Sequence, residues 1–139
     1  MKISVVTAVY NRAETIRQAL ETVQSQTFSD IDHVVQDGGS TDGTLDILKE
    51  ADQTGLRLES EPDKGIYDAI NKGIARAEGD VIGLMHSDDF FAENDILAEV
   101  ARLMEDPQID GVYGDLQYVA ADDTSRVIRH WTSGPSDQA

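Results

Sequence analysis

Apolar and polar positions follow two different periods along the chain. Short runs rich in β-branched residues, typical of strands covered on both faces, alternate with segments in which apolar residues recur every three or four positions, as on a helix. The runs that predict strands are 2–9, 31–36, 56–60, 81–85 and 109–114. Between them, helical patterns run to about Gln26, around Leu45 and Leu48, from Ile66 to Ile74, with Tyr67 on the apolar face, and from Ile96 to Met104. This alternation predicts an α/β fold in which a mainly parallel sheet carries helices on both faces.

The last part of the chain changes character. Residues 116–121 and 126–131 read as two short strands on either side of a polar turn, which predicts a β-hairpin. The final residues, 132–139, have no core pattern and are expected to form a disordered tail. The expected organisation is therefore one domain, 1–131, followed by that tail.

Composition narrows the choice of function. With 11 basic and 27 acidic residues the net charge is −16, which argues against nucleic-acid binding. There is no cysteine, so disulfides and thiolate chemistry are excluded. No apolar run approaches the roughly 18 residues that a membrane helix needs. We expect a cytoplasmic protein, with the inner face of the membrane as one place where it could act.

Polar side chains follow the ends of successive predicted strands. Thr7 and Asn11 belong to the first strand and the loop after it, Asp37 follows the second, Asp63 and Lys64 the third, and Ser87, Asp88 and Asp89 the fourth. The carboxyl ends of parallel strands meet at one edge of the sheet, where α/β proteins bind their ligands. The pattern therefore predicts one pocket assembled from four loops.

Two interpretations of the pair Asp88 and Asp89 remain open from the local sequence. Adjacent carboxylates are costly unless a positive group shares the site, and a divalent cation that carries a phosphate would supply it. Alternatively, the two residues begin the next helix as a capped, solvated connection. The glycines of residues 38–43 match neither a dinucleotide fingerprint nor a P-loop and need mean only a tight turn.

Four motifs in a fixed order resemble those of the family 2 glycosyltransferases. They are ISVVTAVYN at 3–11, QDGGSTDGT at 36–44, EPDKGIYDAINKG at 61–73 and SDD at 87–89. The resemblance covers about residues 2–131 and is strongest to bacterial members that build exopolysaccharide or colanic-acid-type chains. It implies the GT-A fold and an inverting enzyme that transfers a sugar from a nucleoside-diphosphate sugar, most simply a UDP-sugar, to an acceptor hydroxyl during polysaccharide biosynthesis.

The resemblance also implies roles for single residues at the nucleoside. Thr7 and the backbone near Val9 would line the base pocket, close to Asn11. Asp37 would accept a hydrogen bond from a uracil-like imide. Lys64 would lie near the nucleotide or its phosphates.

At the diphosphate, the resemblance makes Ser87, Asp88 and Asp89 a D-x-D-type motif. Asp88 would face the ribose, and Asp89 would ligate Mn²⁺ or Mg²⁺ bridging the diphosphate. The acceptor would be a saccharide or a lipid-linked saccharide. No residue of this chain matches a trusted motif for the catalytic base, which we expect beyond residue 139. A fragment that binds donor without turnover and a sugar nucleotidyltransferase remain alternatives, and apolar surface left uncovered would favour homo-oligomers.

Overall fold

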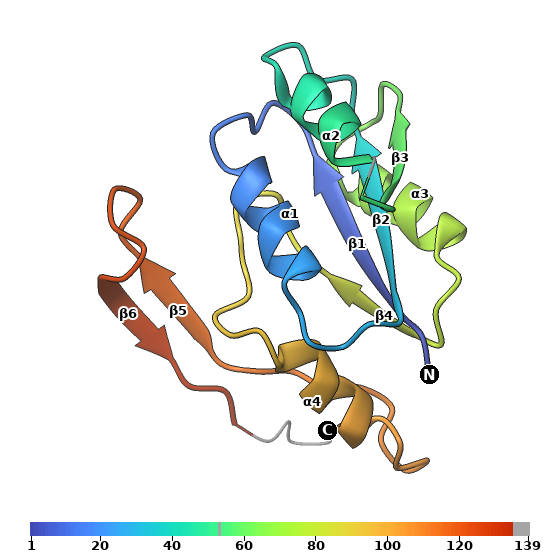
Figure 1. The fold of residues 1–139 in the computed structure, drawn as a ribbon, viewed down its shortest axis with the longest axis vertical. Coiled ribbons are helices and arrows are strands. Elements are labelled where there is room, and N and C mark those ends of the chain that lie inside the picture. The colour runs from blue at the N-terminus through green and yellow to red at the C-terminus, as the bar shows by residue number, and fades with distance from the viewer. Residues whose placement is uncertain (53, 135–139) are drawn as a thin grey trace. The chain divides into compact units, whose positions relative to one another are not determined.

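The computed structural model describes residues 1–52 and 54–134. They form two compact units, one from Met1 to Arg102 and one that begins at Leu103. The first unit contains β1 (Ile3–Val9), α1 (Ile16–Gln24), β2 (Ile31–Asp37), α2 (Thr44–Asp52), β3 (Arg57–Ser60), α3 (Ile66–Arg76), β4 (Val81–Leu84) and α4 (Ile96–Leu103), whose last residue opens the second unit. The second unit contains β5 (Leu116–Val119) and β6 (Val127–Trp131) (Figure 1).

The first unit is built on a parallel sheet in the order β3-β2-β1-β4. Every residue of β1 is buried, as its unbroken run of β-branched side chains predicts for a central strand. The register pairs Ile3 with Ile31 and Val9 with Asp37, so β1 and β2 begin and end level with each other. Asp37 is in turn paired with Ser60, the last residue of β3. Three strands therefore end at the same edge of the sheet.

Helices cover both faces of this sheet, as the alternating pattern predicts. On one face Ile16 and Leu20 of α1 and Leu48 of α2 pack against Val9 and Val35. On the other face α3 lies across β1 and β2 (Figure 1). Gly73 allows this close approach, because a Cβ at that position would lie 2.5 Å from Cγ1 of Val6.

A polar network closes the opposite edge of the sheet, where the strands begin. The Asp32 carboxylate accepts hydrogen bonds from Ser4 Oγ at 2.6 Å, from Arg57 Nε at 2.8 Å and Nη2 at 2.9 Å, and from the Glu78 N–H at 2.9 Å. Burial alone would raise the pKa of Asp32, but these hydrogen bonds outweigh it and hold the pKa at about 2. Arg57 also donates to the carbonyl of Arg76, so the network joins β1, β2 and β3 to the end of α3.

A buried histidine sits in the middle of the sheet. His33 of β2 is 6 % exposed, and its Nε2 lies 3.1 Å from Oγ1 of Thr7 on β1. Burial lowers the pKa of His33 to about 4, against the smaller opposing effect of the Asp32 charge. The imidazole is therefore neutral at neutral pH.

The second unit contains the expected hairpin. β5 and β6 pair antiparallel, with Leu116 opposite Trp131. Residues 132–134 have no regular secondary structure, and residues 135–139 of the expected tail lie outside the described residues. None of the helices in the described ranges is both long enough and apolar enough to cross a membrane.

Three expectations about individual segments are wrong. Residues 109–114 form no strand, although their apolar content is strand-like. β4 is not covered on both faces: Ile82 is 44 % and Leu84 51 % exposed, because α3 packs on β1 and β2 and leaves this face of β4 open. Tyr67 is 81 % exposed and is not a core residue, since α3 buries the face that carries Ala69 and Gly73.

Acid should destabilise the first unit through His33. Because the pKa of His33 is about 4 in the folded protein and near 6.5 when unfolded, the unfolded state binds more protons between these values, and stability falls as pH falls through this window. Urea unfolding should show a loss of about 3 kcal/mol between pH 7.5 and pH 4. His33→Gln should remove this component, whereas the exposed control His130→Gln should retain it. An unchanged pH dependence in His33→Gln would contradict the assignment.

The Asp32 network should be worth far more than an exposed ion pair. Asp32→Ala leaves Arg57, Ser4 and the Glu78 N–H without their acceptor and should lower the free energy of unfolding by about 2–4 kcal/mol. The comparison is Glu50→Ala, which breaks only the exposed pair with Arg17 at 3.6 Å and should cost less than about 1 kcal/mol. Equal losses of unfolding free energy in the two variants would show that the Asp32 network stabilises the protein no more than an exposed ion pair does.

Candidate functional site

The site predicted from the sequence lies where β1, β2 and β3 end. The Gly38 N–H donates to the carbonyl of Val9, and the Glu61 N–H donates to the carbonyl of Asp37. These bonds extend the hydrogen-bond pattern of the sheet by one residue into the loops. The loops after β2 and β3 are therefore each fastened to the neighbouring strand, which brings residues from both loops to one rim.

Asp37 organises the turn after β2. Its Oδ2 accepts hydrogen bonds from the Gly39 N–H at 3.0 Å, the Ser40 N–H at 3.0 Å and Ser60 Oγ at 2.7 Å, while Oδ1 accepts from Ser40 Oγ. The side chain is fully buried, at 0 % exposure. The carboxylate thus folds the 38–40 turn around itself and ties it to the end of β3. Its contact with a nucleobase stays a prediction.

Asn11 shapes the loop after β1 and does not cap α1, contrary to the usual preference of Asn for that position. The helix begins after Thr15, and Asn11 adopts a left-handed backbone with φ 50°. Its Oδ1 accepts from the Thr41 N–H at 2.8 Å, and its own N–H donates to Ser40 Oγ at 2.9 Å. The β1 and β2 loops are therefore interlocked. Tyr10, immediately before Asn11, remains 56 % exposed at this rim.

The loop between β3 and α3 is held by α3 itself. Lys72 Nζ lies 3.1 Å from Glu61 Oε1 and 3.4 Å from Asp68 Oδ2. Asp68 also accepts from the Lys64 N–H at 2.9 Å. Gly65 has φ 115°, a left-handed value that favours glycine, and it starts the helix. These contacts fix where the loop places the exposed Lys64.

Asp88 and Asp89 lie in the loop after β4, and both are exposed. Thr15 Oγ1 donates to the carbonyl of Ser87 at 2.9 Å, which fastens this loop to the start of α1. Partial desolvation raises the pKa of Asp89, and the charge of Asp88 raises it further, against an opposing effect of His86. The next helix, α4, begins only at Ile96. The two carboxylates are therefore not the start of that helix, but they do lie in the exposed connection that leads to it.

The two carboxylates suit a cation that takes its other ligands from a substrate. Within the described residues no group of three or more His, Cys, Asp or Glu side chains could hold a metal ion. Mg²⁺ and Mn²⁺ favour oxygen ligands, and Mg²⁺ commonly binds one or two carboxylates together with substrate phosphates and water. The donor set thus fits a cation that arrives with a diphosphate.

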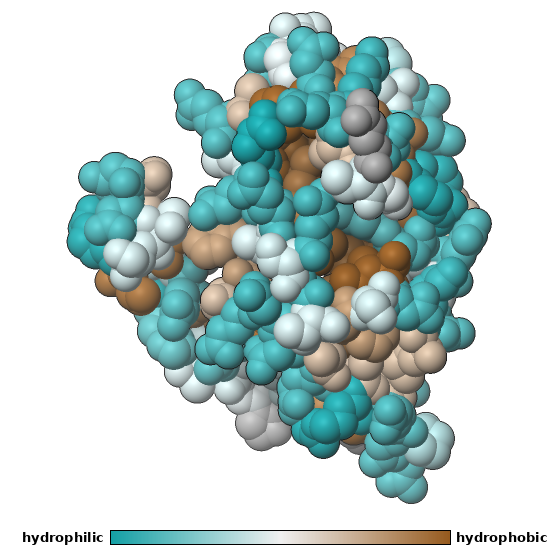
Figure 2. All heavy atoms as spheres, in the orientation of Figure 1, coloured by the Kyte–Doolittle hydropathy of each residue, from teal (hydrophilic) through white to brown (hydrophobic). Residues whose placement is uncertain are grey.

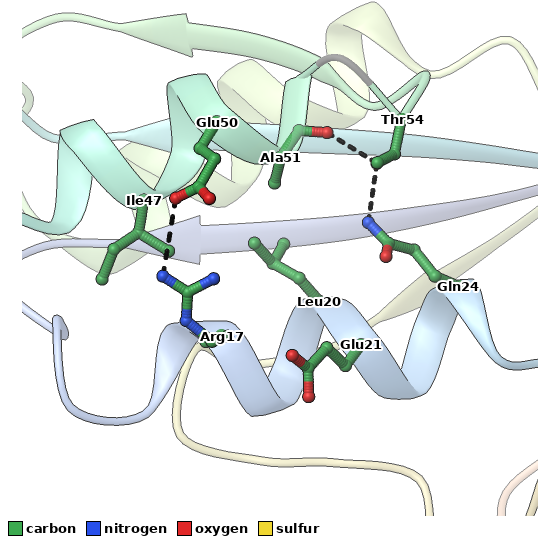
Figure 3. Close-up of a pocket in the computed structure, with 8 residues that line it drawn as sticks. All are labelled: Arg17, Leu20, Glu21, Gln24, Ile47, Glu50, Ala51 and Thr54. Atoms are coloured by element: carbon green, nitrogen blue, oxygen red, sulfur yellow. Dashed lines mark hydrogen bonds and ion pairs between the residues drawn. The ribbon is translucent and has the colours of Figure 1, made fainter.

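A separate hollow between α1 and α2 contains none of the predicted site residues. It has a cavity volume of about 190 Å³ and is spanned by the Arg17–Glu50 ion pair and by a hydrogen bond from Gln24 to Thr54 (Figure 3). Leu20 lies beneath these bridges, and Figure 2 shows hydrophobic surface between the polar side chains of this face. We interpret the hollow as a groove left by helix packing.

The structure brings Asn11, Asp37 and the 61–65 loop together, and it shows which side chains reach the surface. Thr7 is 1 % exposed and its hydroxyl contacts His33, so its side chain does not reach the surface. Sequence reasoning missed Tyr10 as a candidate. The signal was available, because Tyr10 directly follows the last residue of a buried strand.

Comparison with known proteins gives the family. Residues 4–137 match the family description Glycosyl transferase family 2. An uncharacterized glycosyltransferase of Mycobacterium tuberculosis is 35 % identical over 73 % of this chain and 39 % of its own length. A PGL/p-HBAD biosynthesis glycosyltransferase of Mycobacterium bovis is 38 % identical over 81 % of this chain and 46 % of its own. The chain therefore spans less than half the length of these relatives.

Solved structures share the fold. S. aureus TarS 1–349 in complex with UDP-GlcNAc aligns with a TM-score of 0.68 at 28 % identity, covering 76 % of this chain and 31 % of that one. The mannosyltransferase PcManGT from Pyrobaculum calidifontis, solved with GDP-Man and Mn²⁺, aligns with a TM-score of 0.72 at 24 % identity, covering 89 % of this chain and 37 % of that one. With a family match over 4–137 and relatives above 30 % identity, the chain belongs to glycosyl transferase family 2.

Proposed function

We propose that this chain is the donor-binding part of an enzyme that moves a sugar from a nucleoside-diphosphate sugar, most simply a UDP-sugar, to an acceptor hydroxyl with inversion. The observation that carries the proposal is the interlocked rim, in which Asp37 and Asn11 hold three loops together beside an exposed aromatic ring. The likeness to TarS, solved with UDP-GlcNAc, supports a uridine donor.

The nucleoside end of the donor would lie on the β1 and β2 loops. Tyr10 is exposed and would stack on the base, and the backbone of Thr7 and Val9 would line the pocket beside it. Asn11 would act by shaping the loop that presents Tyr10, since its amide oxygen already accepts the Thr41 N–H.

The diphosphate end would lie at the β4 loop. Asp88 would face the ribose and Asp89 would hold Mn²⁺ or Mg²⁺ against the phosphates, with Ser87 positioning both through its carbonyl bond to Thr15. Lys64, exposed on the third loop, would reach the nucleotide or its phosphates. When bound, the cation would offset the charge that develops on the departing diphosphate.

The transfer itself exchanges one bond for another. The acceptor oxygen forms a bond to the anomeric carbon on the face opposite the leaving group, the bond from that carbon to the phosphate oxygen breaks, and a carboxylate takes the hydroxyl proton. Two acidic residues of the second unit already have partners: Asp115 accepts the Ser133 N–H, and Asp122, in the connection between β5 and β6, pairs with Arg126. We propose that the base lies in the part of the family's length that this chain does not span.

The acceptor is proposed at the level of its class. The relative from M. bovis carries the description of a PGL/p-HBAD biosynthesis enzyme, and we propose a saccharide or lipid-linked saccharide acceptor in polysaccharide or glycolipid biosynthesis. The exposed apolar residues of β4, Ile82 and Leu84, give a surface through which further chain or a second copy could pack.

Binding of UDP should require both a divalent cation and Asp89. Calorimetric titration should show binding of UDP with Mn²⁺ and none with EDTA, because the net charge of −16 repels a free diphosphate. Asp89→Ala should weaken binding at least roughly tenfold through loss of a cation ligand. Asp95→Ala, which removes an exposed carboxylate from the loop just before α4, is the matched control and should bind like the wild type. Equal binding in EDTA would contradict the proposal.

A further inference from the structure

Two carboxylates stand near the end of β2, and their surroundings differ. Asp37 is fully buried, and its oxygens accept four hydrogen bonds from the protein. Asp63, from the loop after β3, is only partly buried. Its Oδ1 accepts the Gly65 N–H at 2.9 Å, and within the described residues its Oδ2 makes no hydrogen bond. Asp37 therefore makes its hydrogen bonds within the protein, whereas Asp63 keeps one oxygen that a ligand could donate to.

Gly38 is the reason that the second carboxylate reaches the rim. A Cβ placed on Gly38 would lie 2.6 Å from Asp63 Oδ2 and 3.2 Å from its Cγ. Any side chain at position 38 would therefore compete with the Asp63 carboxylate for the same space. The free oxygen of Asp63 thus occupies the place just after the end of β2 that a side chain at position 38 would otherwise fill.

The position of Asp63 relative to Tyr10 suits a flat ring. Tyr10 follows the end of β1, Gly38 the end of β2, and Asp63 lies three residues beyond the end of β3, with β2 between the other two strands. Neighbouring strands are about 4.8 Å apart, so the ends of β1 and β3 lie about 10 Å from each other. Gly38, which follows the intervening strand β2, has no side chain, so a base stacked on Tyr10 with its edge toward Asp63 would meet none at that position.

We propose that Asp63, in place of Asp37, selects the nucleobase of the donor by accepting a hydrogen bond from a ring N–H on its pairing edge. This inference deepens the proposed function and rests on it. The bases that fit are uracil, through N3–H, and guanine, through N1–H. Adenine and cytosine present an unprotonated ring nitrogen at that edge, and its lone pair would face the carboxylate.

A neutral base also avoids repulsion between the ligand and the Asp63 carboxylate. An unpaired carboxylate beside the diphosphate would repel it, but an ionised carboxylate facing an N–H gains a charge-assisted hydrogen bond. Asp63 follows β3, whereas the Asp88–Asp89 pair follows β4 at the other end of the strand order. Base selection and cation binding are therefore assigned to separate ends of the rim.

The test compares the binding of two ligands by the wild-type protein and by a variant. Affinities are measured by calorimetry in the presence of Mg²⁺. The probes are UDP and the diphosphate of 3-methyluridine, which lacks the N3–H. Wild-type protein should bind UDP roughly 10- to 100-fold more tightly than the methylated probe, the range expected for a hydrogen bond to a charged group. Asp63→Ala should bind UDP more weakly and should lose most of this preference. A merely structural role for Asp63 would weaken both probes equally and would overturn the proposal.

A second variant keeps Asp63 in the sequence but moves its carboxylate away from the base. Gly38 does not have a left-handed backbone, so Gly38→Ala is conformationally allowed, but its Cβ would displace the Asp63 carboxylate. It should reproduce the lost preference. Asp46→Ala, an exposed carboxylate in the first turn of α2, is the control of equal charge and should keep the wild-type preference.

The identity of the base follows from the same titrations. GDP that binds more tightly than UDP would assign guanine, and the reverse would assign uracil, while ADP and CDP should bind at least roughly tenfold more weakly than the better of the two. ADP binding as tightly as UDP would overturn the inference. Failure of wild-type protein to bind any of the probes would refute the proposed function itself, whereas binding with full preference retained in Asp63→Ala would refute only the role of Asp63.

Discussion

The arrangement of the rim depends on the Asp37 carboxylate and the hydrogen bonds it accepts. A buried carboxylate is costly without partners, and here four donors from the 38–40 turn and from Ser60 satisfy it. The same bonds fold the turn after β2 and fasten it to the end of β3. Ser40 in turn accepts a hydrogen bond from the Asn11 N–H, which fixes the loop after β1 as well. One satisfied charge therefore fixes three loops that would otherwise move independently.

The charges of the molecule divide the proposed site by chemistry. The nucleoside end offers an aromatic ring, backbone and one partly buried carboxylate, which suit a neutral base. The β4 loop offers two exposed carboxylates, which suit a cation rather than an anion. The net charge of −16 repels a diphosphate, and a cation that came with it would offset this repulsion. Metal dependence and base selectivity should therefore be separable properties.

The sequence was sufficient for the architecture because strand and helix periods alternate clearly and the polar residues fall at strand ends. It was insufficient where tertiary packing decides. Tyr67 has helical spacing, but α3 turns its Ala69 and Gly73 face to the sheet. Residues 109–114 have strand-like composition but form no strand. Gly38 read as a turn residue, and only the structure shows that the Asp63 carboxylate takes the space its side chain would occupy.

The most direct test of a donor site at the strand ends is a backbone amide NMR titration of UDP in the presence of Mg²⁺. The account predicts that shift changes gather in the loops at 10–12, 37–41, 63–65 and 86–89. The groove between α1 and α2, residues 17–24 and 47–52, should be unaffected. Shift changes centred on that groove, or spread evenly over the sheet, would contradict the account.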